Sequence, residues 1–147
     1  MFKKLFVPID GSSLSQRAIA VSIDLAVQLG AHITGFIVEP DLPLSVASHD
    51  AEAFAERIQE HQAKTELHSN ILLHQFEVRA SQAGVVFRGL SVTSYSVDDI
   101  IAEEAEKSGC DMIVIVTHGR GKLGEFVFGS HTKKVISRTK IPVLVLH

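Results

Sequence analysis

Two hydrophobic patterns alternate along this chain. Short unbroken apolar runs are typical of strands buried in a parallel sheet, and segments with apolar residues every three or four positions are typical of amphipathic helices. The runs predict strands at 5–9, 31–38, 85–92, 111–116 and 141–146, and helices at 14–29, 51–81, 97–107 and 130–138. Strands that alternate with helices predict an α/β fold, a single-domain open five-stranded parallel sheet with helices on both faces.

Local signals mark several helix ends. Ser13 with Gln16, and Ser96 with Asp99, have the spacing of a capping box, and Gly30 is a natural helix stop. The apolar stripe predicted for the helix at 14–29 consists of Ala18, Val21, Leu25 and Leu29.

Two segments are less regular. The strand at 31–38 is interrupted by Gly35. A helix over 51–81 would be about 45 Å long, more than a crossover in a small domain needs. We therefore expect either a break near Ser69–Asn70 or a first half that projects from the domain.

Composition narrows the class of protein. The 147 residues are 46% hydrophobic with a formal net charge of −3, which fits one domain over 1–147 and argues against a nucleic-acid partner. No apolar run approaches the roughly 20 residues that span a membrane, so we expect a cytoplasmic protein without a membrane partner. The single cysteine, Cys110, excludes an internal disulfide, and we expect it to pack in the core.

The loop after the strand at 111–116 is the strongest candidate for chemistry. It contains Gly119, Gly121 and Gly124, and it ends at Gly129-Ser130 where a helix begins. Glycines let backbone N–H groups approach a ligand, and a helix start adds unpaired donors, which together suit a phosphate. A surface turn without a ligand explains the same glycines.

Two familiar phosphate motifs do not fit this loop. Gly119 to Gly124 spell G-x-G-x-x-G, but the motif follows the fourth strand, and the last strand lacks the acidic residue that the dinucleotide fingerprint requires. A P-loop is excluded because no Gly-Lys-Ser/Thr is present. The eight histidines have no metal-ligand spacing, and we expect no metal site made by the protein alone.

A different spacing does fit: Gly119, nine residues, then Gly129-Ser130. Together with Val7-Pro8-Ile9-Asp10-Gly11-Ser12 after the first strand and Pro142-Val143-Leu144-Val145 at the end, this resembles the universal stress protein family over the whole chain. The resemblance implies a Rossmann-like fold of the adenine-nucleotide-binding type, usually a homodimer. It implies ATP or another adenine nucleotide as ligand, and allows Mg or Mn to be bound through the phosphates.

The resemblance also implies which residues bind. Asp10, with the backbone around Pro8 and Ile37, would hold the adenosine part. The phosphates would be held by Gly119, Gly129, Ser130 and the backbone of His131. Apart from the resemblance, His118 and His131 flank this predicted phosphate site in the sequence, and their side chains either help to hold charge there or have only a surface role.

Val116 departs from the pattern, because the nucleotide-binding branch has glycine three positions before Gly119. A β-branched side chain adds bulk where the family's nucleotide lies against bare backbone. Three hypotheses follow: a stress-response module that binds an adenine nucleotide, a nucleotide-free dimer that acts through protein contacts, and a slow nucleotide hydrolase in which Asp10 positions a metal and water. The last strand, an apolar edge, is the expected dimer contact, with the N–H groups of 143–146 free to pair.

Overall fold

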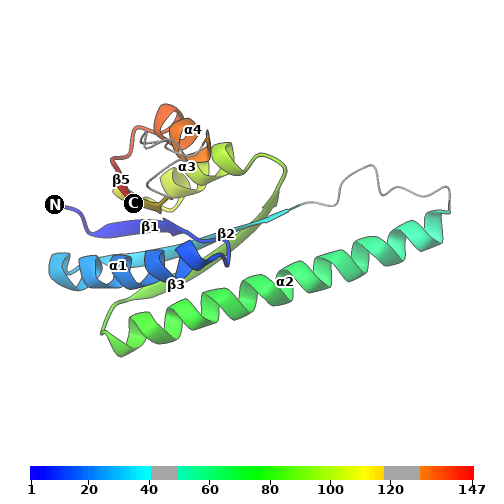
Figure 1. Ribbon diagram of the computed structural model, residues 1–147, viewed down its shortest axis with the longest axis horizontal. Helices are drawn as coiled ribbons and strands as arrows, with labels where there is room; N and C mark the ends of the chain where they lie inside the picture. Colours follow the sequence, from blue (N-terminus) through cyan, green and yellow to red (C-terminus); the bar gives the residue numbers. More distant parts are fainter. Residues whose placement is uncertain (41–49, 118–129) are drawn as a thin grey trace.

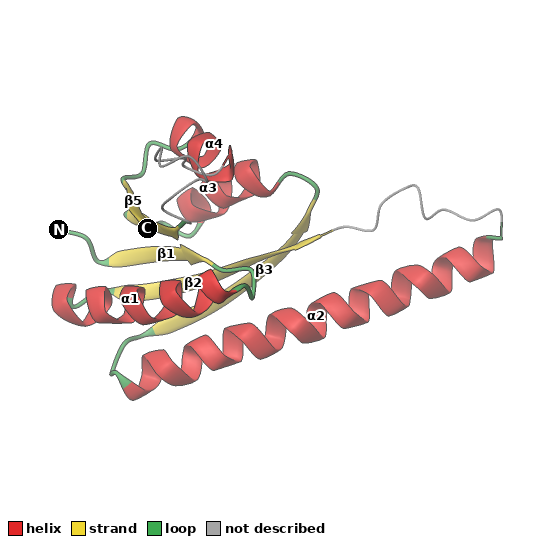
Figure 2. Cartoon of the chain, viewed as in Figure 1, coloured by secondary structure: helices red, strands yellow, loops and turns green. Residues whose placement is uncertain are grey.

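Five parallel strands form the centre of the molecule. The computed structural model describes residues 1–40, 50–117 and 130–147. The strands run in the order β3-β2-β1-β4-β5 and are β1 (Lys4–Pro8), β2 (His32–Pro40), β3 (Phe87–Ser94), β4 (Met112–Val116) and β5 (Val143–Leu146). Each adjacent pair is parallel, so the predicted five-stranded parallel sheet is confirmed (Figure 2).

Helices cover both faces of this sheet. One face carries α1 (Ser13–Leu29) and α2 (Ala51–Gln82), and the opposite face carries α3 (Val97–Lys107) and α4 (Ser130–Arg138) (Figure 1). Two hydrophobic clusters correspond to these two layers. Successive side chains of a strand point to opposite faces, so in β1 Val7 joins the α1–α2 cluster while Phe6 joins the α3–α4 cluster.

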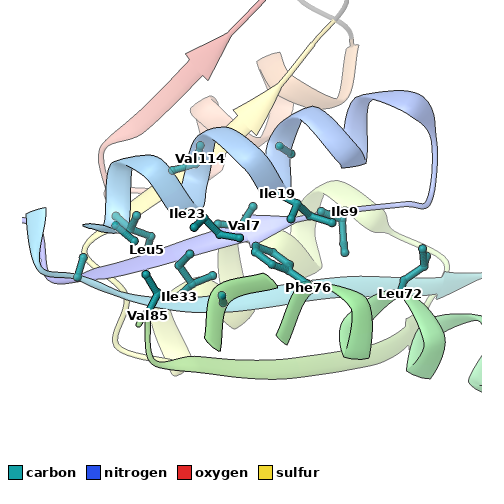
Figure 3. Packing of buried hydrophobic residues seen from close by; sticks show 14 of the residues in the cluster. Leu5, Val7, Ile9, Ile19, Ile23, Ile33, Leu72, Phe76, Val85 and Val114 are labelled. Carbon is teal, nitrogen blue, oxygen red and sulfur yellow. The ribbon is translucent and has the colours of Figure 1, made fainter. Parts of the chain in front are cut away.

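The α1–α2 cluster is the larger of the two. Ile19 and Ile23 of α1 and Phe76 of α2 meet Val7 and Ile33 from the central strands (Figure 3). These residues are at most 7% exposed, and burying each such side chain contributes about 1.5–3 kcal/mol to folding. This core holds β1 and α1 together, and therefore holds the loop between them.

The buried face of α1 differs from the predicted stripe. Its buried residues are Ser15, Ala18, Ile19, Ser22, Ile23 and Ala26, whereas Leu25 and Leu29 are only partly buried. The predicted capping box is also absent. Ser12 is the N-cap and makes no side-chain cap bond, and Ser13 is already helical. The predicted stop at Gly30 is confirmed, since its φ of 58° is left-handed.

The long helix α2 is continuous through Ser69–Asn70. The expected break is therefore absent, and the alternative expectation, a projecting first half, is confirmed. Its 32 residues span about 48 Å, and its first half extends beyond the sheet (Figure 1). The buried residues of α2 all belong to its second half: Ser69, Leu72, Phe76 and Ala80. Ser69 is small and 2% exposed, which lets the helix pass close to the body without a break.

Gly35 does not interrupt β2, which runs through it in register with β1 and β3. A Cβ atom at this position would lie 2.7 Å from the ring of Phe87 and 2.9 Å from the ring of Phe76. Glycine is required here because two aromatic rings pack against the bare backbone.

None of the helices in the described ranges is long and apolar enough to cross a membrane.

Candidate functional site

A cavity of about 480 Å³ lies beyond the carboxyl ends of β1 and β4. The chain adds β2 and β3 on one side of β1, and β4 and β5 on the other, so strand order reverses between β1 and β4. Ligands of open α/β sheets bind at this switch point. The volume lies within the range of roughly 300–1,000 Å³ for small-molecule sites.

Asp10 stands at the end of β1 in a tightly hydrogen-bonded turn. The hydroxyl oxygen of Ser15 accepts hydrogen bonds from the backbone N–H groups of Asp10 and Gly11, at 2.9 and 3.0 Å. The same hydroxyl donates to Oδ1 of Asp10 at 2.9 Å, and the N–H of Ser12 donates to that oxygen at 2.9 Å. Both of these hydrogen bonds go to Oδ1, so Oδ2 is the carboxylate oxygen to which a ligand could donate.

These contacts change the acidity of Asp10. Burial by itself raises the pKa of the carboxyl group, but the hydrogen bonds from Ser12 and Ser15 outweigh it, and the net pKa lies below the ordinary 3.8. The carboxylate is therefore ionised at neutral pH and acts as a hydrogen-bond acceptor. Gly11 completes the turn with a φ of 82°, a conformation that residues with a side chain rarely adopt.

The walls of the cavity are mainly apolar and come from both layers. The lining side chains without charge or hydroxyl are those of Pro8, Ile9, Leu14, Ala18, Phe36, Val38, Val97, Ile101, Ile115 and Val116. Thr117 follows β4, and its N–H donates to the carbonyl of Leu146 at 2.8 Å. A flat aromatic group with few charges suits such walls.

The start of α4 supplies the polar end of the cavity. His131 and Thr132 lie in the first turn and line it. Nδ1 of His131 lies 2.5 Å from Oδ1 of Asp98, and Nζ of Lys134 lies 3.2 Å from Oδ2 of the same carboxylate. The first turn of a helix presents unpaired N–H groups and a positive dipole end, which favour an anion.

The structure brings together part of the predicted set. Pro8, Asp10, Val116 and His131 all line the cavity. Ile37 does not lie among the lining residues that the structure describes: its side chain packs in the α1–α2 cluster, while its neighbours Phe36 and Val38 face the cavity. The role expected for its backbone stays a prediction.

The predicted phosphate loop itself cannot be compared with the cavity. Gly119 and Gly129 lie outside the described residues, as does His118. Ser130 is the first residue of α4, and its side chain is likewise not described. The expectation that these residues hold phosphates therefore stays a prediction.

Sequence reasoning missed several residues of the site. Ser15 follows Asp10 by five positions and lies in the first turn of α1, and that spacing could have identified it as a partner. Asp98 had no such signal, because it meets His131 only once α3 and α4 pack side by side.

The cysteine has a structural explanation. Cys110 is 7% exposed, and burial raises the pKa of its thiol, so the expectation that it packs in the core is confirmed. Within residues 1–40, 50–117 and 130–147, no group of three His, Cys, Asp or Glu side chains could hold a metal ion.

Comparison with known proteins gives a consistent result. A sequence model of the Universal stress protein family matches residues 1–147. Among curated proteins, the chain is 26% identical over 151 residues to Universal stress protein YxiE of Bacillus subtilis (strain 168), and the match covers 99% of each protein.

Solved structures share the fold. The universal stress protein UspA from Lactobacillus plantarum superimposes with a TM-score of 0.78 at 20% identity, over 99% of this chain and 98% of that one. A universal stress protein in complex with cAMP gives a TM-score of 0.65 at 21% identity, over 99% and 97%. The universal stress protein from Archaeoglobus fulgidus in complex with dAMP gives 0.63 at 16%, over 99% and 98%.

Proposed function

This chain belongs to the universal stress protein family, and from that membership and the geometry of the cavity we propose that it binds an adenine nucleotide, ATP or AMP, at the carboxyl ends of β1 and β4. The observation that carries the proposal is the 480 Å³ cavity at the switch point, with a carboxylate at one side and the first turn of α4 at the other. Two relatives of the same fold are complexes with adenine nucleotides, cAMP and dAMP.

The adenosine part fits the region around Asp10. The apolar wall, which includes Phe36, Val38 and Ile101, can exclude water from a flat base. Oδ2 of Asp10 can accept hydrogen bonds from the ribose hydroxyls, because Ser12 and Ser15 fix the carboxylate through its other oxygen.

The phosphate part fits the start of α4. Backbone N–H groups in the first turn and the adjoining dipole end attract an anion without further side chains. We expect Ser130, Gly119 and Gly129 to contribute there, with Mg or Mn bound through the phosphates rather than by the protein alone. The protein then acts as a regulatory binding module whose occupied state differs from its empty one.

One observation favours a second candidate, a nucleotide-free dimer that acts through protein contacts. Val116 is one of the residues that line the cavity, at a position where the nucleotide-binding branch of the family has glycine. Because a β-branched side chain reduces the space next to the backbone, this position decides between the two candidates.

The direct test is to denature freshly purified protein and identify any released nucleotide. The proposal predicts ATP or AMP at near-stoichiometric yield, together with saturable heat in a calorimetric titration by ATP. GTP serves as the control ligand, because its base has a different hydrogen-bonding edge. Absence of released nucleotide together with a flat ATP titration would contradict adenine-nucleotide binding and favour the second candidate.

The variant Val116→Gly refines this test. If the valine only crowds the ligand, the glycine variant should bind ATP more tightly. Its free energy of unfolding should fall by more than the roughly 0.5–1 kcal/mol of added backbone entropy, because Val116 also packs against the α1–α2 cluster. Titrations of both proteins with ATP and AMP, alongside their unfolding midpoints, measure this. Weaker ATP binding by the glycine variant would show that the valine contacts the ligand favourably and does not crowd it.

A further inference from the structure

A buried carboxylate joins α3 to α4 at the rim of the cavity. Asp98 is in the first turn of α3, and its side chain is only 10% exposed, whereas that of His131 is 71% exposed. Oδ1 of Asp98 contacts Nδ1 of His131 at 2.5 Å, and Oδ2 contacts Nζ of Lys134 at 3.2 Å. Asp98 is thus the fixed member of the group, and it orients the more exposed imidazole.

This contact decides which ring nitrogen of His131 remains for a ligand. A carboxylate can only accept, so Nδ1 donates to Asp98 and Nε2 is the nitrogen left over. Within the described residues, Nε2 has no hydrogen bond. His131 is one of the residues that line the cavity, so Nε2 belongs to a residue of the cavity wall.

We propose that His131, oriented by Asp98, contacts the phosphate groups of the bound nucleotide through Nε2. This inference rests on the proposed function and deepens it, since it assigns to a side chain part of the preference for a phosphorylated ligand over adenosine. His131 is the binding residue, and Asp98 is a positioning residue that acts through it.

Charge explains why the arrangement suits a phosphate. A phosphate oxygen accepts from Nε2 only when both ring nitrogens carry hydrogen, and the imidazolium then lies between two anions, the carboxylate and the phosphate. Lys134 balances the charge of Asp98, so this carboxylate repels a nearby phosphate less than an unpaired one would. The dipole at the start of α4 acts in the same direction.

A matched pair of variants isolates Nε2. His131→Asn retains a polar group near the position of Nδ1 but has nothing at Nε2, whereas His131→Gln carries its amide near the position of Nε2. We expect His131→Asn to weaken ATP binding about tenfold, the scale of a charge-assisted hydrogen bond, and His131→Gln to weaken it less. Adenosine should bind all three proteins alike, as measured by calorimetric titration.

A double-mutant cycle tests the role of Asp98. Asp98→Asn alters the electrostatic potential in every background, so its effect on ATP binding is compared between the parent and His131→Asn. If Asp98 acts by orienting His131, Asp98→Asn should weaken ATP binding several-fold more in the parent than in His131→Asn. Equal effects in the two backgrounds would overturn the positioning role.

The control is Arg138→Gln, which breaks the neighbouring α3–α4 ion pair, 2.5 Å between Arg138 and Asp99, without touching the cavity. It should leave the ratio of ATP to adenosine affinity unchanged. If Arg138→Gln lowers that ratio as much as His131→Asn does, packing of α3 on α4 is the cause and the inference is overturned. If the parent and His131→Asn bind ATP equally tightly, this inference alone is overturned. If the parent binds neither ATP nor adenosine, the proposed function is overturned and the inference with it.

Discussion

Ser15 is the residue on which the geometry of Asp10 depends. It is 2% exposed, and its hydroxyl takes part in three hydrogen bonds with the turn at the end of β1. A buried hydroxyl costs stability unless it is hydrogen-bonded, and here it also satisfies two backbone N–H groups that would otherwise need water. One hydroxyl therefore fixes both the backbone and the carboxylate of the candidate site.

Ser15→Ala should lower the free energy of unfolding by about 1–3 kcal/mol, because two N–H groups lose their acceptor. It should also raise the pKa of the Asp10 carboxyl group. A carboxyl group with a depressed folded-state pKa stabilises the protein above its unfolded pKa, and this contribution is lost as pH falls through the folded value. That part of the stability difference should therefore shrink below about pH 4.

Unfolding curves between pH 2 and 7 and an NMR titration of the Asp10 carboxyl carbon measure both effects. Ser13→Ala is the control, since Ser13 is the exposed first residue of the same helix. An unchanged Asp10 pKa in Ser15→Ala would show that Ser12 and the backbone hold the carboxylate without Ser15.

At the scale of elements, α2 combines two different environments in one helix. Its second half packs against the sheet through Leu72, Phe76 and Ala80, whereas its first half has no fully buried residue. Leu72 also lies, with His68, next to Gly11, so the docked half supports the turn that follows Asp10. The two halves should therefore differ in what they contribute to stability.

Two phenylalanines on α2 test this difference. Phe76 is 0% exposed and packs on Phe87 with ring centroids 4.8 Å apart, whereas Phe54 belongs to the projecting half. Phe76→Ala should lower the free energy of unfolding by about 3–5 kcal/mol, and Phe54→Ala by less than about 1 kcal/mol. Denaturant unfolding of both variants measures this, and equal losses would contradict a projecting first half.

The elements also show how much of the fold and of the candidate site can be predicted from the sequence. Hydrophobic periodicity predicted the parallel sheet and each strand and helix that the structure describes, because strand and helix patterns alternate clearly along the chain. It missed that β2 continues through Gly35 and which face of α1 is buried, since both depend on side chains from distant segments. For the same reason, motifs near strand ends identified Asp10 and Val116, but not Asp98.

At the scale of the whole molecule, the sheet has two edges, β3 and β5. The four residues of β5 are all only partly buried, which leaves an apolar edge within reach of another chain. Not all of its N–H groups are free, contrary to the sequence-based expectation. The carbonyls of Pro142 and Leu146 accept hydrogen bonds from the N–H groups of Ile113 and Thr117, on the β4 side. Alternate residues of a strand in a parallel pair direct their backbone groups to the same side. The backbone groups of 142, 144 and 146 therefore face β4, and those of Val143 and Val145 face outward.

We therefore predict a homodimer that forms through the outer edge of β5. Val145→Pro should convert it to a folded monomer, because proline removes an outward N–H group and leaves the pairing with β4 in place. Leu144→Pro is the contrasting control: it removes an N–H group that faces β4 and should lower the unfolding midpoint as well. Light scattering coupled to gel filtration gives the mass of each protein. A dimeric Val145→Pro variant with the affinity of the parent would mean that another surface makes the dimer, and a parent that stays monomeric at micromolar concentration would mean that side chains alone protect this edge.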